Sequence, residues 1–557
     1  MGFLGILEDR HHQHVPGTTI LNEESAHSER QTAGLKHGRG KDAHIILVPQ
    51  PTDDPNDPLN WPEAKKLILI STACFGGVMM AAVYSSLLNP ALGVMATELD
   101  RPINDIAVLS GYGLLTAGAA GFIVAACSRK WGKRPVFFFS SLLGTVGSII
   151  GSSVLTYNGV LAARIVQGIS TATYESILVG TIGDLYFVHQ RGIYMSVVQF
   201  ILAAVSNLAS VVCGPVTNTL GWPWLFRLCV IFSGLQTLLL FFFVPETSYN
   251  RPSQTATAPV VAEIQDADTQ SEKQHDSECR HLEITSTHTA APGTTLATPV
   301  KPLKKSFVQE LSLFNGTFSK EGIIQLLIAP FAVCLNVAVL WSVVVSGGMT
   351  ALYVSQAIGV AQIFQAPPYF LSAAGVGYLS LGPFIGGLIG SVIMSVINDP
   401  IIKWCAVKNK GIYEPEYRLL PVVGGLLVGA GLFGFGTLAQ EGKTYYATAT
   451  MHGLTLGGIV IVAISVSAYV LDAYHDMSDD IFVTMIIFKN FLFYGFSWFV
   501  NSWIASSGPE HVFYVFGGIA FAMTATAPIV FIFGKRYRGY WSRHNLLRKL
   551  NIQAHYH

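Results

Sequence analysis

Long apolar stretches alternate with short polar ones along the chain, and about twelve of them are long enough to cross a membrane. A helix rises ~1.5 Å per residue, so about 20 apolar residues cover a hydrocarbon layer of roughly 30 Å. A polar insert at 247–320 divides the stretches into two equal sets. The pattern therefore predicts an all-α membrane protein with twelve transmembrane helices in two six-helix halves.

The apolar stretches give approximate bounds for each expected helix. In the first half we expect helices at 67–94, 106–127, 134–156, 159–183, 193–218 and 222–244. In the second half we expect them at 323–350 or longer, 374–397, 418–438, 447–471, 482–504 and 511–534. The predicted domains are a cytoplasmic tail at 1–66, halves at 67–246 and 321–534, a largely disordered cytoplasmic linker at 247–320, and a cytoplasmic tail at 535–557.

Composition agrees with a membrane protein and excludes several other classes. Of 557 residues, 51% are hydrophobic and 12% are charged, whereas a soluble domain averages about 25% charged residues. Basic and acidic residues balance at 34 each, so no nucleic-acid partner is expected. The chain has no GxxxxGK[ST] loop, no CxxC pair and no evident catalytic cluster. We therefore expect no enzyme activity, no metal and no cofactor.

The basic residues indicate the orientation, because Lys and Arg gather in cytoplasmic loops. One end of the predicted helices is rich in them, whereas the other end carries little more than Arg101 and Lys443. We expect a multi-pass protein of the plasma membrane with both termini and the linker in the cytoplasm. The basic end holds Arg129, Lys130, Lys133, Arg134, Arg191, Lys301, Lys304, Lys305, Lys403, Lys408, Lys410, Lys535, Arg536 and Arg538.

Three motifs in the first half resemble elements of the major facilitator superfamily. The loop at 128–135 reads SRKWGKRP and is similar to the family's G-x-L-x-D-R-x-G-R-R-P element, with Arg129 where the family has Asp. The stretch RIVQG at 164–168 is similar to an R-x-x-x-G element associated with proton coupling in antiporters. The stretch SVVCGP at 210–215 resembles the G-x-x-x-G-P element of drug:proton antiporters, with Ser210 for the first glycine.

Further segments resemble the fungal drug:proton antiporter family, in the branch of polyamine and histidinol permeases. They read DPLNWP at 57–62, PET at 245–247 and GIYEPEYRL at 411–419. The resemblance implies a monomeric secondary transporter whose partners are the lipid bilayer, a small organic substrate and protons. It implies proton-coupled efflux of a drug-like molecule or secondary metabolite, with proton-coupled uptake of an organic cation such as a polyamine as an alternative. A non-transporting nutrient sensor is a second alternative.

The fourth predicted helix carries two ionisable residues, Arg164 and Glu175. They are eleven positions apart, which places them on one face of the helix about 16 Å apart in depth. Charged side chains inside a spanning helix cost about 2.5 to 3.5 kcal/mol, so they normally face a wet cavity or a partner. We expect Glu175 to carry a proton or bind a cationic group; a structural hydrogen bond to a neighbouring helix is the alternative.

Charged residues at the cytoplasmic ends of the helices suit a latch between helices. The resemblance implies that Asp184 pairs with the basic loop after helix two, through Arg129, Lys133 or Arg134. Asp472 and Lys489 are expected to form the corresponding contact in the second half. Polar and aromatic residues that could line a substrate cavity, by hydrogen bonding, stacking or cation–π contact, are Tyr84, Asn89, Tyr112, Tyr174, Asn207, Asn336, Trp341 and His452.

Overall fold

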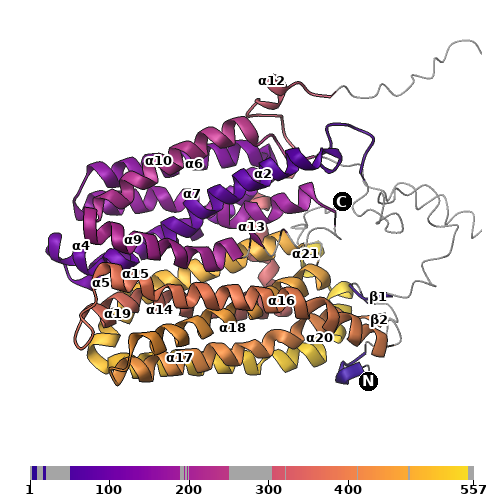
Figure 1. The fold of residues 1–557 in the computed structure, drawn as a ribbon. Helices are drawn as coiled ribbons and strands as arrows, with labels where there is room; N and C mark the ends of the chain where they lie inside the picture. Colours follow the sequence, from indigo (N-terminus) through magenta and orange to yellow (C-terminus); the bar gives the residue numbers. More distant parts are fainter. Residues whose placement is uncertain are drawn as a thin grey trace, which may run out of the picture.

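The computed structural model describes residues 3–8, 17–20, 51–187, 200–249, 304–319, 321–409, 412–474 and 477–549, with single positions at 15, 194, 197 and 198. These residues form two helical bundles that lie against each other along their length (Figure 1). We call the end that carries the turn at Gly132 the inner end, because the sequence predicts it to be cytoplasmic. It lies to the right in Figure 1, where the two labelled termini also lie.

The first bundle is built from residues 63–243. Its first helix runs from α2 through a π-helical stretch, η4, into α3 before a short segment at the outer end. The elements in chain order are α2 (Glu63–Gly76), η4 (Gly77–Val83), α3 (Tyr84–Ser86), η5 (Asn89–Ala91), α4 (Leu92–Glu98), α5 (Ile103–Trp131), α6 (Lys133–Ser153), α7 (Tyr157–Leu185), η6 (Ile201–Val205), α9 (Ser206–Leu220) and α10 (Pro223–Phe243).

The second bundle is built from residues 323–543 and is followed by a short helix, α21 (Leu546–Lys549). The elements in chain order are α13 (Ile323–Ala332), η8 (Val333–Leu335), α14 (Val337–Gln365), α15 (Ala373–Leu379), α16 (Leu381–Lys408), η9 (Pro415–Gly424), α17 (Gly425–Gln440), α18 (Tyr445–Ala473), α19 (Ser478–Ala525) and α20 (Ala527–Arg543).

Glycines set the sharp breaks between helices. Gly132 joins α5 to α6 with a φ of +95°, a conformation that L side chains rarely adopt. Gly508 has a φ of +79° inside α19 and is followed by Pro509, so α19 consists of two helices that meet at this point. The sequence predicts a break here, between the helices expected at 482–504 and 511–534.

Several predicted bounds need correction. The seventh predicted helix, 323–350, continues to Gln365 after a short interruption at η8. The eighth, 374–397, continues to Lys408. Its last part lies beyond the apolar stretch, where hydropathy does not mark the helix. Within the described residues, nine helices are long and apolar enough to cross a membrane, including one continuous 66-residue stretch from Ser478 to Arg543 that contains the Gly508 break. The protein is thus a multi-pass all-α membrane protein, and the count of twelve spans stays a prediction.

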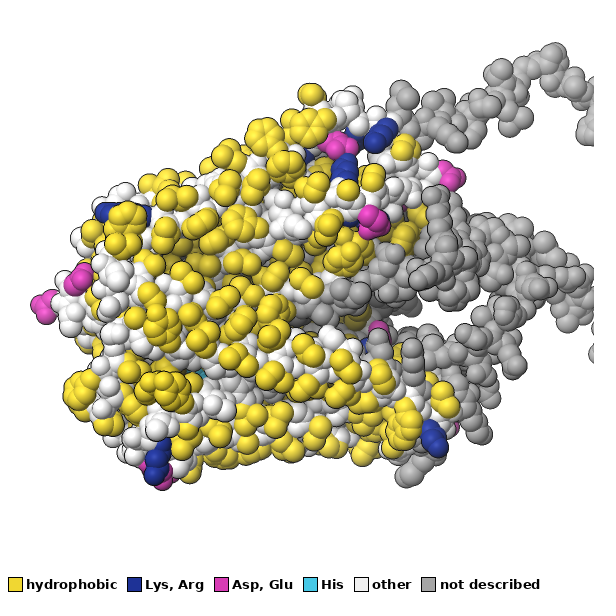
Figure 2. All heavy atoms as spheres, viewed as in Figure 1, with side chains coloured by type: hydrophobic (Ala, Val, Ile, Leu, Met, Phe, Trp, Pro, Cys, Tyr) yellow, Lys and Arg dark blue, Asp and Glu magenta, His cyan; other side chains and the backbone are white. Residues whose placement is uncertain are grey.

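The surface of the bundle agrees with a lipid environment. On the face in Figure 2, hydrophobic side chains cover the flank and charged side chains gather at the two ends. Val212, Leu238 and Val396 are 60%, 60% and 65% exposed, although each lies in the middle of a helix. Exposed aliphatic side chains of this kind on long helices are stable where the surrounding solvent is hydrocarbon.

Two segments outside the helices also have defined contacts at the inner end. Near the N-terminus, β1 (Thr19–Ile20) pairs antiparallel with β2 (Ile412–Tyr413) of the second bundle, and the buried Ile6 packs in a cluster with Ile402 and Tyr413. In the predicted linker, residues 250–303 lie outside the described residues, whereas 304–319 contact the first bundle and include α12 (Phe307–Glu310). The last part of the predicted linker thus has defined contacts, and the disorder of the linker as a whole stays a prediction.

Candidate functional site

An ion pair between the two bundles lies at the centre of the inner half. Glu175 of α7 accepts from Lys489 of α19, with 2.8 Å between Oε1 and Nζ. Its second oxygen, Oε2, accepts from Nδ2 of Asn490 at 3.1 Å. The side chains of Glu175 and Lys489 are 9% and 19% exposed, so the pair is largely withdrawn from solvent. The prediction that Lys489 pairs with Asp472 is wrong, because α19 turns Lys489 toward the first bundle.

Small residues allow α19 to reach α7. A Cβ added at Gly118 of α5 would lie 3.2 Å from the Cβ of Asn490, and one added at Gly111 would lie 2.2 Å from Oγ of Ser497. α5 and α19 therefore pack closely over several turns, which presents Lys489 and Asn490 to Glu175. Removing one member of a buried ion pair leaves an uncompensated charge, so these positions are strongly coupled.

Arg164 lies about three helical turns further out on α7 and is 2% exposed. Its Nη1 donates to Oε1 of Gln167 at 2.9 Å, and Nε2 of Gln167 donates to Oγ of Ser148 at 3.0 Å. The hydroxyl of Tyr84 lies 2.9 Å from the same Ser148 oxygen. The hydrogen-bond partner of Arg164 among the described residues is thus neutral. The Nε atom of Arg164 has no hydrogen-bond partner among these residues.

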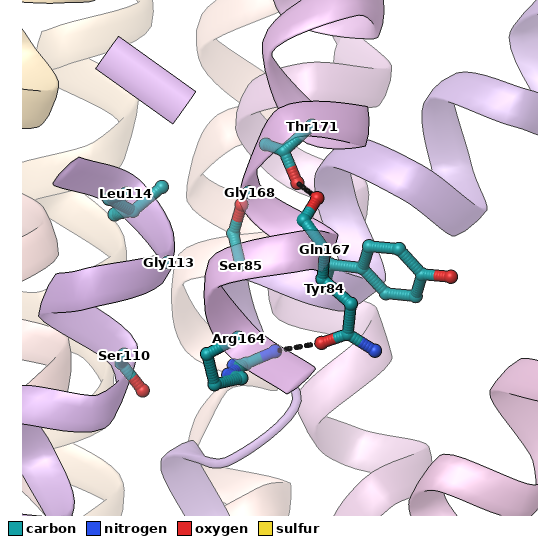
Figure 3. A pocket seen from close by; sticks show the side chains of 9 residues that line it. All are labelled: Tyr84, Ser85, Ser110, Gly113, Leu114, Arg164, Gln167, Gly168 and Thr171. Carbon is teal, nitrogen blue, oxygen red and sulfur yellow. Dashed lines mark hydrogen bonds between the residues drawn. The ribbon is translucent and has the colours of Figure 1, made fainter. Parts of the chain in front are cut away.

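A small cavity adjoins this arginine within the first bundle (Figure 3). The cavity has room for about one water molecule. Figure 3 shows Arg164 pointing to Gln167, with Ser110 on the neighbouring helix across the gap. A water there could satisfy the arginine. The lining residues are Tyr84, Ser85, Ser110, Gly113, Leu114, Arg164, Gln167, Gly168 and Thr171.

A second cavity lies between the two bundles in the outer half. It too has room for about one water molecule, so the described residues close around it. The hydroxyl of Tyr353 donates to Oδ1 of Asn207 at 2.5 Å and joins the bundles beside it. The lining side chains include no Asp, Glu, Lys or Arg. They belong to Asn89, Pro90, Asn207, Ser210, Ala357, Val360, Val376, Ser380 and His452.

His452 is the most distinctive group of this second cavity. It is 3% exposed, and its ring centroid lies 5.2 Å from that of Tyr353 and 5.6 Å from that of Phe435. Its Nε2 atom has no hydrogen-bond partner among the described residues. A buried polar atom normally has a partner, so this nitrogen is available to a water in the cavity.

The predicted cavity residues divide into two groups. Tyr84, Asn89, Asn207 and His452 line one of these two cavities, as their polarity suggests. The other four predicted residues do not line either of these two cavities.

Asn336 caps α14 and accepts from the amide of Ala338 at 3.0 Å, and Trp341 donates to Thr526 at 2.7 Å. Tyr174 contacts Gln236 inside the first bundle, and the Tyr112 ring lies 5.3 Å from that of Tyr494 at the contact between bundles. Sequence alone could not separate the two groups, because the direction of each side chain depends on helix rotation.

At the inner end of the first bundle, the latch residues take separate partners. Lys133 pairs with Asp184 at 2.6 Å, whereas Arg134 donates to backbone oxygens, including that of Phe241 at 2.8 Å. The amides of Lys133 and Arg134 donate to the carboxylate of Glu246 at 2.9 and 3.1 Å. Gly132 permits this turn, since a Cβ there would lie 2.3 Å from the Glu246 carboxylate.

Arg129, the third predicted partner of Asp184, reaches the second bundle. Its Nη2 lies 2.8 Å from Oδ1 of Asp480 at the start of α19. Asp480 was missed by the sequence prediction, because its partner lies on the other half of the chain. Among the described residues, these two ion pairs connect α19 to the first bundle, one at the inner end and one nearer the middle.

The second bundle has its own charge cluster at the inner end. Asp472 accepts from Nε of Arg418 at 2.8 Å and from the hydroxyl of Tyr413. Burial and the charge of Asp472 raise the pKa of Tyr413 far above its usual range, so this phenol stays protonated and donates. Asp472 thus forms a latch with a neighbour in its own bundle, in place of the predicted Lys489.

A buried network beside it was also missed. Arg538 pairs with Glu414 at 3.0 Å and with Glu416 at 2.8 Å, and Lys535 pairs with Glu414 at 2.6 Å. The N-terminal segment adds to this network, since the hydroxyl of Thr18 donates to Glu414 at 2.8 Å. The EPE sequence before helix nine and the basic run after helix twelve were the signals that could have suggested the pairing.

Two helical bundles joined by ion pairs form a multi-pass membrane protein with two halves. The family model of the Major Facilitator Superfamily matches residues 74–498, and the chain belongs to this superfamily. An uncharacterized MFS-type transporter of Schizosaccharomyces pombe is 25% identical, with 98% of this chain and 96% of that protein covered. Protein HOL1 of Saccharomyces cerevisiae is 22% identical, with 98% of each chain covered.

A further relative is named as an efflux pump, and two solved structures share the fold of the chain. Efflux pump radE of Floropilus chiversii is 25% identical over 90% of this chain and 86% of the pump. The xylose transporter XylE of E. coli, in a partially occluded inward-open conformation, has a TM-score of 0.54 at 12% identity, covering 83% and 98% of the two chains. The human organic anion transporter MFSD10 has a TM-score of 0.53 at 15% identity, covering 84% and 100%. At these identities the structures show the fold alone.

Proposed function

We propose that the protein is a proton-coupled secondary transporter that exports a drug-like molecule or secondary metabolite across the plasma membrane. The observation that supports this proposal is the chemistry of the side chains between the bundles: around the small second cavity they are neutral polar side chains, apolar side chains and His452, and the bundles would have to move apart there to admit a substrate. Such a lining suits an uncharged or weakly polar molecule, because it offers hydrogen bonds and aromatic contacts without a counter-charge. The efflux pump among the relatives supports the outward direction.

Glu175 is the proposed site of proton coupling. A proton on Glu175 would cancel its charge, so Lys489 would lose its ionic partner and the contact between α7 and α19 would weaken. The bundles could then separate at the inner end, where substrate enters in an export cycle. Release of the proton to the cytoplasm would restore the ion pair and close this end again. Alternating access of this kind is the motion that a two-half transporter requires.

Uptake of an organic cation is the second proposal. Carboxylates lie at the contact between the bundles, as a cationic substrate would need, in Glu175 and Asp480. Each of them, however, already contacts a basic side chain, Lys489 or Arg129. A polyamine would have to displace these side chains, whereas a neutral molecule would not, and this favours export.

The test uses the full chain in liposomes with an imposed pH gradient. Transport of a neutral aromatic compound and of spermidine is measured in both directions, with an ionophore that abolishes the gradient as control. The proposal predicts that the neutral compound moves against the direction of proton flow and that spermidine does not move. Gradient-driven accumulation of spermidine together with protons would favour uptake and overturn export. If the protein binds one of the two compounds but transports neither, the result would favour a sensor.

A further inference from the structure

The last part of the linker lies at the rim of the first bundle, at its inner end. The helix α12 begins after Ser306, whose Oγ accepts from the amide of Gln309 while the Gln309 side chain accepts from the Ser306 amide. Figure 1 places α12 beyond the inner ends of α6 and α10, on the side of the first bundle that faces away from the second bundle. We call residues 304–314 the interfacial segment.

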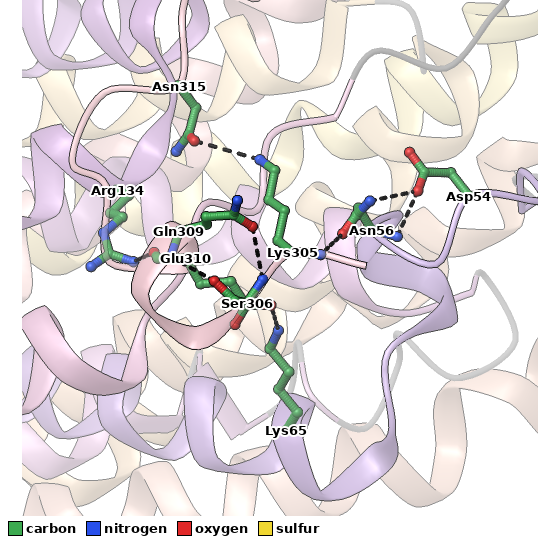
Figure 4. Close-up of polar contacts among 9 residues, drawn as sticks. All are labelled: Asp54, Asn56, Lys65, Arg134, Lys305, Ser306, Gln309, Glu310 and Asn315. Carbon is green, nitrogen blue, oxygen red and sulfur yellow. Dashed lines mark hydrogen bonds and ion pairs between the residues drawn. The ribbon is translucent and has the colours of Figure 1, made fainter. Parts of the chain in front are cut away.

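Polar contacts fix this segment to the first bundle (Figure 4). Glu310 pairs with Lys65 of α2 at 2.7 Å, and Arg134 of the latch loop donates to the backbone oxygens of Glu310 and Leu311. The amide of Lys305 donates to Oδ1 of Asn56 at 2.9 Å. The position of the segment is therefore set by the same arginine that follows the tight turn between α5 and α6.

Three apolar side chains of the segment are exposed. Phe307, Val308 and Phe314 are 60%, 76% and 58% exposed. The ring of Phe314 lies 6.2 Å from that of Phe139, which is itself 45% exposed on α6. Phe139 is six residues into α6, about 9 Å along its axis, so Phe314 lies beside the second turn of a helix that is long and apolar enough to cross a membrane.

Basic side chains complete the pattern. Lys304 and Lys305 are exposed and lie three and two residues before Phe307, with Ser306 between. The Nζ atom of Lys305 lies 3.5 Å from Oδ1 of Asn315 (Figure 4). Apolar side chains beside lysines are typical of segments that lie in the boundary between headgroups and acyl chains. Lysines at this depth are attracted to anionic lipids of the cytoplasmic leaflet. The apolar part of the segment is continuous with the lipid-facing surface of α6, through the contact between Phe314 and Phe139.

We propose that the interfacial segment binds the anionic cytoplasmic leaflet, with Phe307, Val308 and Phe314 inserted and Lys304 and Lys305 on the lipid headgroups. The proposal rests on the orientation expected from the sequence, which places this end in the cytoplasm. Because Arg134 holds the same segment, lipid binding would stabilise the latch at the inner end of the first bundle.

The first experiment measures insertion in nanodiscs, which expose both leaflets and so do not depend on the orientation of the protein. A benzoylphenylalanine replaces Val308 in the full chain, and the matched control carries it at the exposed Glu441 in the loop between α17 and α18. After illumination, mass spectrometry should find phospholipid attached at position 308 and much less at 441. If position 308 cross-links only to protein, or cross-links to lipid no more than position 441 does, the proposal is overturned.

The second experiment tests the headgroup preference. Discs of phosphatidylcholine with or without phosphatidylserine are compared by the enrichment of phosphatidylserine around the protein. Each lysine near an anionic surface contributes about fivefold, so the K304Q/K305Q double variant should lose most of the enrichment. The control K443Q removes an exposed lysine from the opposite end and should retain it. Equal enrichment in the double variant and the control would contradict the proposed role of the two lysines.

Discussion

The Nζ atom of Lys489 lies 2.8 Å from Oε1 of Glu175, and this contact joins the second half of the chain to the first within the bundle. The two residues are 314 positions apart in the sequence. Asn490, the next residue on α19, holds the other oxygen of the same carboxylate. A single turn of α19 therefore satisfies a buried acid of α7, and any motion that separates the bundles must break these contacts.

The first prediction concerns the stability of this pair. Lys489→Met leaves Glu175 charged and largely buried, so it should lower the free energy of unfolding by about 3 kcal/mol. Adding Glu175→Gln removes that charge and should recover most of the loss. Thermal unfolding of both single variants and the double variant in one detergent gives the coupling. Additive losses would show that the pair contributes nothing as a pair.

The second prediction concerns the latch of the first bundle. Lys133→Asp and Asp184→Lys should each reduce transport, and the double reversal should restore part of it, with a coupling of about 0.5 to 3 kcal/mol. The Arg134 guanidinium donates to the backbone oxygen of Glu310 and not to Asp184. Arg134→Asp should therefore show no such coupling with Asp184→Lys. Initial transport rates per folded molecule provide the measurement. Rescue of the Arg134 variant by Asp184→Lys would refute this pairing.

The third prediction concerns the charge of the cavity between the bundles. Asn207→Asp keeps the oxygen that accepts from Tyr353 but places a carboxylate beside His452. Binding of a neutral substrate should weaken about tenfold, and an organic cation of similar size should bind better. Asn89→Asp offers a second position in the same lining. Substrate affinities measured by scintillation proximity would decide, and unchanged affinities in both variants would place the substrate elsewhere.

The fourth prediction concerns the N-terminal segment. Thr18→Val removes the hydrogen bond to Glu414, and Ile6→Asp places a charge in a buried cluster with Tyr413 and Ile402. We expect a loss of about 1 kcal/mol for Thr18→Val and a larger loss for Ile6→Asp. Protection of residues 412–417 in hydrogen exchange should fall in both variants. Wild-type protection in Ile6→Asp would mean that the segment does not dock on the second bundle in the membrane.

Much of the fold could be predicted from the sequence, because lipid imposes a simple rule on helix length and apolarity. The break at Gly508 follows from a polar interruption that contains Gly and Pro, and the turn at Gly132 follows from its motif. The helix ends were less predictable. Helices such as α16 continue past the apolar stretch into the polar region at Lys408, where hydropathy no longer marks them.

The site could be predicted only in part. Glu175 was recognised as a functional candidate because a charge in a spanning helix is costly, and it lies in a contact between halves. Its partner Lys489 was assigned to Asp472 because both lie near the inner ends of neighbouring helices. Which face of α19 meets the first bundle depends on the packing of glycines such as Gly118 against it, and a single sequence does not contain that information.

The most direct test of the account is proton movement driven by substrate. Liposomes that contain the protein and a pH-sensitive dye receive a gradient of the neutral substrate without an imposed pH gradient. The account predicts substrate-driven proton flux in the opposite direction for the wild type. It predicts none for Glu175→Gln, which still binds substrate, whereas the exposed control Glu441→Gln behaves as wild type. Wild-type proton flux in folded Glu175→Gln would contradict the central claim.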